Sequence, residues 1–137
     1  MMNSSLNRKK NMRGFTLVEL LIVMSILGIL ASISVPSYRR HQLKARETVL
    51  SEDLYQMRRS IDAFYADKGQ YPESLDDLIR SHYLRDLPRD PFTRVVDSWE
   101  CVLPESTEDG ETAEGGCFDI KSGSTQIGMN GTPYNEW

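Results

Sequence analysis

Histidine is scarce in this chain of 137 residues. His41 and His82 are its only histidines, and neither has a nucleophile or a second metal ligand at a recognised spacing. A glycine-rich phosphate loop is also missing from the sequence. These absences leave no catalytic residue to propose, and they argue against enzymes that use a bound metal, a nucleophilic triad or a nucleotide.

Charge is missing from one long stretch. Between Phe15 and Val35 the only charged residue is Glu19. As a helix, these 21 residues are long enough to cross a hydrocarbon core of about 30 Å. A lone carboxylate in a membrane span costs roughly 2.5 to 3.5 kcal/mol on insertion scales and usually faces a partner. We therefore expect one membrane-spanning helix in which Glu19 meets a cation.

Residues 1–14 precede this span and contain no acid but four basic side chains: Arg8, Lys9, Lys10 and Arg13. A secretory signal peptide has a similar basic start, but its cleavage site follows the apolar region. Here the candidate processing point, between Gly14 and Phe15, precedes the apolar region. An ordinary signal anchor with a stray acid is the alternative.

The run Arg13-Gly-Phe-Thr-Leu-Val-Glu19 resembles the class III leader of type IV pilins and of the pseudopilins of type II secretion. The resemblance implies that an inner-membrane prepilin peptidase cleaves after Gly14 and that the new amino terminus, Phe15, is N-methylated. Glu19 then becomes the fifth residue of the mature chain. In a helical filament its carboxylate would pair with the Phe15 ammonium of a neighbouring subunit, which removes the burial cost of both charges.

The helix is expected to continue beyond the membrane. Apolar residues recur there at steps of 7, 4, 3, 4 and 3, a one-sided stripe typical of an amphipathic helix: Leu43, Leu50, Leu54, Met57, Ile61 and Phe64. One helix should therefore run from Phe15 to about Asp67, roughly 75 to 80 Å in length. Pro36 removes a backbone donor and should kink or locally melt the helix near Ile33.

A second motif follows the long helix. Gly69 is expected to end that helix as its left-handed cap, and Ser74 with Asp77 to cap a short second helix. From Gly69 to Phe92 the chain reads Gly-Gln-Tyr-Pro, then the short helix, then Leu-Pro-Arg-Asp-Pro-Phe. This run resembles the major, G-type pseudopilins of type II secretion, and it is more discriminating than the leader, which all the relatives share.

The remaining residues predict strands and loops. Val95–Leu103 and Cys117–Lys121 have β-rich sequences, and a turn is expected at Asn130-Gly131. The acidic segment between the two strands reads as a solvated loop. A Cys101–Cys117 disulfide would close it and contribute about 3 kcal/mol by loop entropy, with two buried free thiols as the alternative.

The predicted fold class is α+β and type IV pilin-like, with a long N-terminal helix packed on a small globular body. Residues 1–14 form the cleaved leader and 15–35 the transmembrane and assembly helix. The body, 36–137, comprises the amphipathic helix to about residue 67, a loop and short helix over 68–92, and a small antiparallel sheet with the disulfide-closed loop over 93–137.

Calcium is a point where the sequence departs from the G-type pattern. The resemblance implies a calcium ion in the C-terminal loops, and this ion takes six to eight oxygen ligands. The closing part of the chain has few carboxylates, with Asp119 as the candidate ligand. We therefore expect no cofactor, with the disulfide replacing the ion as the staple.

Charge counts alone do not orient the span. Four basic residues follow it and equal the four of the leader: Arg39, Arg40, Lys44 and Arg46. The leader resemblance places the first residues in the cytoplasm, and the cysteines suit an oxidising compartment. The expected topology is a single pass through the inner membrane with the body in the periplasm.

The net charge limits the classes of partner that the protein is expected to bind. Without the leader the chain has 12 basic and 20 acidic residues, since 16 minus 4 is 12, and its formal charge is −8. An acidic body disfavours nucleic acid, which is bound through clustered Lys and Arg. The basic residues beside the span suit membrane lipids with anionic head groups.

The resemblance implies a structural, non-enzymatic role in protein transport. Copies of the chain would form a type II secretion pseudopilus that pushes folded proteins across the outer membrane. Its expected partners are prepilin peptidase, minor pseudopilins and an inner-membrane assembly platform. One alternative is a type IV pilin of a surface filament for adhesion, motility or DNA uptake. Another is a membrane-anchored periplasmic enzyme or binding module, for which the composition offers no pocket.

Overall fold

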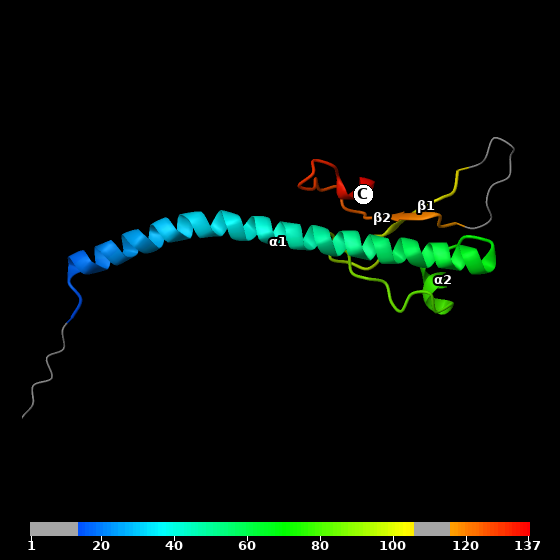
Figure 1. Cartoon of the computed structure of the whole chain (residues 1–137), viewed down its shortest axis with the longest axis horizontal. Coiled ribbons are helices and arrows are strands. Elements are labelled where there is room, and N and C mark those ends of the chain that lie inside the picture. The colour runs from blue at the N-terminus through cyan, green and yellow to red at the C-terminus, as the bar shows by residue number, and fades with distance from the viewer. Residues whose placement is uncertain (1–13, 106–115) are drawn as a thin grey trace, which may run out of the picture. The chain divides into compact units, whose positions relative to one another are not determined.

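The computed structural model describes residues 14–105 and 116–137 (Figure 1). The elements in chain order are α1 (Leu17–Lys68), α2 (Leu75–Arg80), β1 (Glu100–Val102), β2 (Asp119–Lys121) and the 3-10 helix η1 (Tyr134–Glu136). This is the predicted α+β fold, with a long helix, a short helix and a two-stranded antiparallel sheet. Residues 1–13 of the predicted leader and residues 106–115 of the predicted solvated loop lie outside the described residues. Internal contacts divide the chain into a unit that ends at Arg39 and a body from Arg40 to Trp137.

Helix α1 has 52 residues and close to the predicted bounds. It continues through Pro36 without a break, and the Ser37 hydroxyl donates a hydrogen bond to the Ile33 carbonyl oxygen at 3.4 Å. A proline removes one N–H from the helix, and the neighbouring turns keep their own hydrogen bonds. The local melting expected near Ile33 is therefore not seen in the isolated chain, and the kink stays a prediction.

The two predicted helix caps are present. Gly69 has a positive φ of 73°, and its N–H donates to the Tyr65 carbonyl oxygen at 2.8 Å, which ends α1. At the start of α2, the Asp77 carboxylate accepts from the backbone N–H of Ser74 at 3.2 Å and of Glu73 at 3.1 Å. These local bonds fix where each helix begins or ends.

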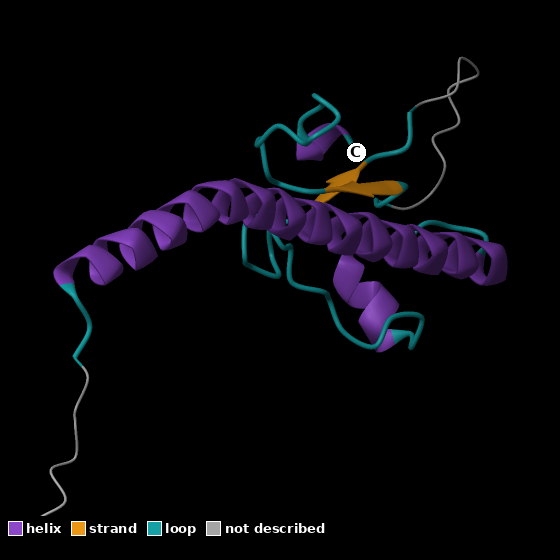
Figure 2. Ribbon diagram, turned by 60° about the vertical axis from the view of Figure 1, so that its left-hand side comes forward, coloured by secondary structure: helices purple, strands orange, loops and turns teal. Residues whose placement is uncertain are grey.

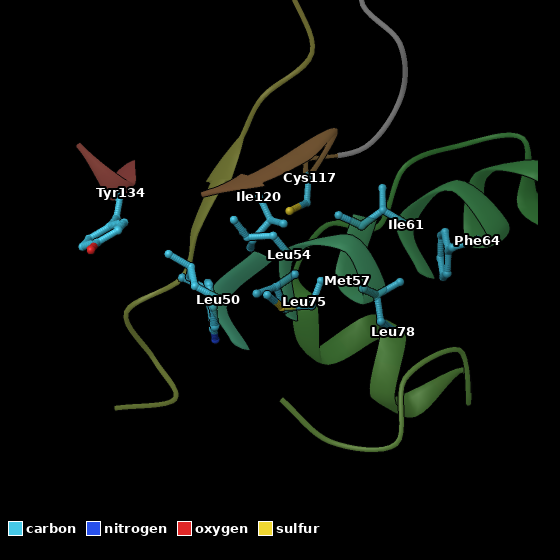
Figure 3. Packing of buried hydrophobic residues seen from close by; sticks show 11 residues of the cluster. Leu50, Leu54, Met57, Ile61, Phe64, Leu75, Leu78, Cys117, Ile120 and Tyr134 are labelled. Atoms are coloured by element: carbon cyan, nitrogen blue, oxygen red, sulfur yellow. The ribbon is translucent and has the colours of Figure 1, made fainter. Parts of the chain in front are cut away.

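The predicted stripe of α1 forms the centre of the core (Figure 3). Leu43 is only partly buried, whereas the later members of the stripe are buried: Leu50, Leu54, Met57, Ile61 and Phe64. Helix α2 lies on one side of this half of α1 and the β1–β2 sheet on the other (Figures 1 and 2). Both supply apolar side chains to the cluster, among them Leu78 and Ile120.

The sheet is shorter than predicted. β1 and β2 pair with Cys101 opposite Ile120, but β1 does not extend back to Val95. The Val95 carbonyl oxygen instead accepts from the Asp90 N–H at 3.1 Å, and the Trp99 indole donates to the Pro88 carbonyl oxygen at 2.8 Å. These residues bond to the preceding connection, so they have no strand partner.

The Leu-Pro-Arg-Asp-Pro connection is organised by Asp90, whose side chain is fully buried. Its carboxylate accepts from the backbone N–H of Phe92 at 2.8 Å and of Thr93 at 3.2 Å, and from the Ser122 hydroxyl. Nothing in the local sequence indicates this role of Asp90. Three donors to one buried carboxylate tie the connection to the residues after β2.

Candidate assembly segment

Thr16 starts α1 and leaves the Gly14–Phe15 bond outside the helix. The Glu19 N–H donates to the Thr16 hydroxyl oxygen at 3.2 Å, and the Leu20 N–H donates to the Thr16 carbonyl oxygen at 3.1 Å. Thr followed three residues later by Glu has the spacing of a capping box, and an acid in the first turn favours the helix dipole. The sequence contained this signal for Thr16, although it was not used to predict the cap.

Nothing in the described chain requires glycine at position 14. A Cβ atom built on Gly14 would have no neighbour within 4 Å. The next side chain, Phe15, is 81% exposed. A requirement for glycine here would therefore come from another molecule that binds this peptide, as a processing enzyme does.

The apolar part of α1 has no cover of its own. Every described residue up to Arg39 is exposed, and the large apolar side chains from Phe15 to Val35 are between 42% and 81% exposed. The helix is long and apolar enough to cross a membrane, with a mean hydropathy of 2.4 over its most apolar stretch. Such a surface needs lipid or other protein chains around it.

Polar groups within this segment are satisfied, with one exception. Three hydroxyls donate to carbonyl oxygens three or four residues earlier, at 2.7 to 2.9 Å: Ser25, Ser32 and Ser34. In the described ranges 14–105 and 116–137, ion pairs join Arg58 to Asp119 and Asp77 to Arg80. Glu19 has no cationic partner among those residues, so its charge is the one group of the segment left for another molecule.

The other candidate residues are not brought into a site. His41 and His82 are both exposed, and His82, with a φ of 64°, lies just after α2. Cys101 and Cys117 form a disulfide with a Cα–Cα distance of 5.0 Å. The Asp119 carboxylate lies 2.7 Å from the Arg58 guanidinium. Within the parts of the chain that the structure describes, no group of three or more His, Cys, Asp or Glu side chains could hold a metal ion.

Comparisons with known proteins agree with this segment and with the body. Residues 9–35 match the prokaryotic N-terminal methylation motif. The chain is 32% identical over 101 residues to the type II secretion system core protein G of Klebsiella michiganensis, which covers 62% of this chain and 71% of that protein. The Aeromonas hydrophila protein of the same name is 33% identical over the same shares.

A true pilin is also similar over a shorter stretch. The type IV major pilin of Myxococcus xanthus is 32% identical over 66 residues, which cover 48% of this chain and 30% of that protein. No solved structure matches the chain. The core protein G relatives match more of both chains than this pilin does. The chain belongs to the family of the type II secretion system core protein G, the major pseudopilin.

Proposed function

We propose that this protein is the structural subunit of a type II secretion pseudopilus. It assembles with copies of itself through α1, and the filament helps to push folded proteins across the outer membrane. The observation that carries the proposal is the uncovered apolar half of α1 with the single carboxylate of Glu19 in its first turn. The names of the relatives, which are type II secretion core proteins, support it.

Assembly moves α1 from lipid to a bundle of identical helices. Prepilin peptidase first cleaves after Gly14, so that Phe15 carries the methylated amino terminus. The Glu19 carboxylate of the entering subunit then meets the Phe15 ammonium of a subunit already in the filament. Each charge supplies the partner that the other lacks, while apolar side chains exchange lipid contacts for contacts with neighbouring helices.

The chain is a single-pass inner-membrane protein with its body in the periplasm. Minor pseudopilins and an inner-membrane platform are its further protein partners in assembly. Before assembly, lipid head groups surround the end of the span, where the four basic side chains are exposed: Arg39, Arg40, Lys44 and Arg46. The role is structural, with no catalytic step assigned to any residue.

A type IV pilin of a surface filament is the second candidate. The similarity to the Myxococcus xanthus major pilin favours it, but that match covers less of both chains than the matches to core protein G. The buried Asp90 connection argues for the secretion reading, because it lies in the run that resembles G-type pseudopilins. A gene neighbourhood with a secretin and a secretion ATPase, but without a retraction motor, would distinguish the two.

Glu19→Ala tests the proposal in a strain whose own copy of the gene is deleted. Removing one member of a buried ion pair typically costs about 3 to 5 kcal/mol, so filaments and secretion should be lost. Insertion, cleavage after Gly14 and folding of the body should persist, because alanine is more apolar than glutamate. These are read by membrane fractionation, mass spectrometry and limited proteolysis.

Glu52→Ala is the matched control. Glu52 is an exposed carboxylate on the same helix that accepts a hydrogen bond from the Gln56 side chain at 3.0 Å. This variant should assemble and secrete as the wild type does. Normal filaments and normal secretion from Glu19→Ala would refute the proposed assembly role.

A further inference from the structure

Two charged side chains of α1 hold the closing segment, which we define as residues 122–137. The Glu47 carboxylate oxygen Oε1 accepts hydrogen bonds from the Met129 N–H at 2.6 Å and from the Tyr134 hydroxyl at 2.9 Å. The Arg58 guanidinium donates to the Trp137 carbonyl oxygen at 2.7 Å. Glu47 and Arg58 are 11 residues apart, about three helical turns, so they leave α1 on the same side.

Tyr134 is the apolar anchor of the closing segment. Its ring is fully buried and stacks on Phe92 with a centroid distance of 3.8 Å, while Trp137 meets it edge-on at 5.1 Å. Burial, and then the hydrogen bond to the Glu47 carboxylate, raise the pKa of Tyr134 to about 12. The hydroxyl therefore keeps its proton at neutral pH and remains a donor to Glu47.

Two side-chain oxygens of this region, on Asp119 and Asn130, do not suit the calcium ion that the G-type resemblance implies. The Asp119 carboxylate accepts from the Arg58 Nε–H at 2.7 Å and from the Ile120 N–H at 2.7 Å. The Asn130 side-chain oxygen accepts from the N–H and the hydroxyl of Thr132, at 3.0 and 2.8 Å. Calcium needs six to eight free oxygen ligands, and a guanidinium beside Asp119 repels a cation.

At Glu47 the closing segment offers hydrogen-bond donors, whereas a cation site would offer oxygen acceptors. Toward Glu47 it presents two hydrogen-bond donors, the Met129 N–H and the Tyr134 hydroxyl, rather than a set of acceptors. We propose that the Glu47 carboxylate holds the closing segment in place of a divalent cation. This clamp, the pair of hydrogen bonds that Glu47 accepts, lies entirely within one chain. The fold of the body therefore does not depend on calcium. The disulfide alone does not hold the closing segment, because it joins β1 to Cys117, which precedes that segment.

The test is thermal unfolding of the full chain in detergent, followed by the fluorescence of Trp99 and Trp137. For the wild type, the chelator EGTA and millimolar calcium should give the same Tm, and terbium should show no luminescence sensitised by the aromatic residues of the closing segment. Glu47→Ala should lower the Tm by roughly 5 to 10 °C, since hydrogen bonds to a charged acceptor are lost. Glu47→Gln should lose less, because its amide oxygen still accepts.

Asp62→Ala, at an exposed acid on the same helix, is the control and should melt with the wild type. A fall in the wild-type Tm in EGTA that calcium restores and magnesium does not would overturn the proposal, as would one terbium bound per chain. An unchanged Tm in both Glu47 variants would also overturn it. If Glu47→Ala fails to fold, Glu47→Gln and the metal titrations of the wild type still decide whether Glu47 or a cation holds the closing segment. These readouts need no filament, so the two proposals fail separately. Normal secretion from Glu19→Ala would count only against the proposed function, and the melting and metal-binding results count only against the role of Glu47.

Discussion

The two units of the chain use the same helix in opposite ways. Up to Arg39, α1 exposes every residue that the structure describes, although most of them are apolar. From Arg40 onward, polar residues separate the apolar ones, and the stripe from Leu50 to Phe64 is buried against α2, β2 and the closing segment. The first unit therefore depends on other molecules to cover its surface, whereas the body covers its own.

The carboxylates of the two units differ in the same way, in whether the chain itself supplies their partners. In the body, Asp119 pairs with Arg58, Asp90 accepts from two backbone N–H groups and a hydroxyl, and Glu47 accepts from the closing segment. The Glu19 side chain has no cation within the described residues. Substitutions in the first unit should therefore affect assembly without affecting the fold, and substitutions in the body should affect stability first.

The largest effect is expected at Gly14. A Cβ there meets nothing in the chain itself, so Gly14→Arg should leave the folding of the body unchanged while blocking cleavage almost completely. Mass spectrometry of the wild-type mature protein should find methylated Phe15 as its first residue, and the variant should retain Met1. Gly14→Ala should be cleaved poorly. Wild-type filaments built from chains that keep Met1 would show that the processing step is wrong.

An intermediate effect is expected at the disulfide, and only in the body. Cys101→Ser with Cys117→Ser should lower the free energy of unfolding by about 3 kcal/mol, the loop-entropy value for a closed loop of this size. Denaturant unfolding with the membrane span in detergent measures the loss, and insertion and cleavage should be unchanged. Non-reducing peptide mapping of native protein should recover Cys101 linked to Cys117. Free alkylatable thiols at both positions would contradict the prediction.

The smallest effect is expected at Asp53. Burial, then the charges of Asp90 and Glu52, raise the pKa of Asp53 above its ordinary value. A carboxyl group whose pKa rises on folding binds its proton more tightly in the folded state, so its ionised form destabilises the fold at neutral pH. Asp53→Asn should raise the Tm at pH 7 by roughly 2 to 4 °C, the scale of a surface substitution.

The pH dependence of that gain is the sharper test. The gain should shrink as the pH falls through the raised pKa toward the ordinary value of 3.8, because Asp53 then becomes neutral in the folded protein. Asp62→Asn, at an exposed acid on the same helix, should give no comparable gain. A gain that grows on acidification would show that Asp53 is stabilising.

Local signals in the sequence predicted most of the helical structure. The stripe from Leu50 to Phe64 and the caps at Gly69 and Ser74 depend on neighbours a few residues away, and all are present. β1 was predicted too long, because strand length depends on a partner and Val95 bonds to Asp90 instead. No local pattern indicates the clamp by Glu47, since its two donors are 82 and 87 residues away.

The sequence by itself determined the candidate assembly segment, since the basic side chains of residues 8–13, the Gly14–Phe15 junction, the lone Glu19 and the apolar span are all contiguous. Features that lie next to one another in the chain are visible in its periodicity and charge spacing, without knowledge of the fold. Only the tertiary structure decided which charges of the body are used internally. In the folded chain Asp119 pairs with Arg58, the buried Asp90 accepts from the Ser122 hydroxyl, and Glu47 accepts from the Tyr134 hydroxyl. These pairings join residues that are 32 to 87 positions apart. They depend on how the packed core brings distant segments together, which no single stretch of sequence encodes.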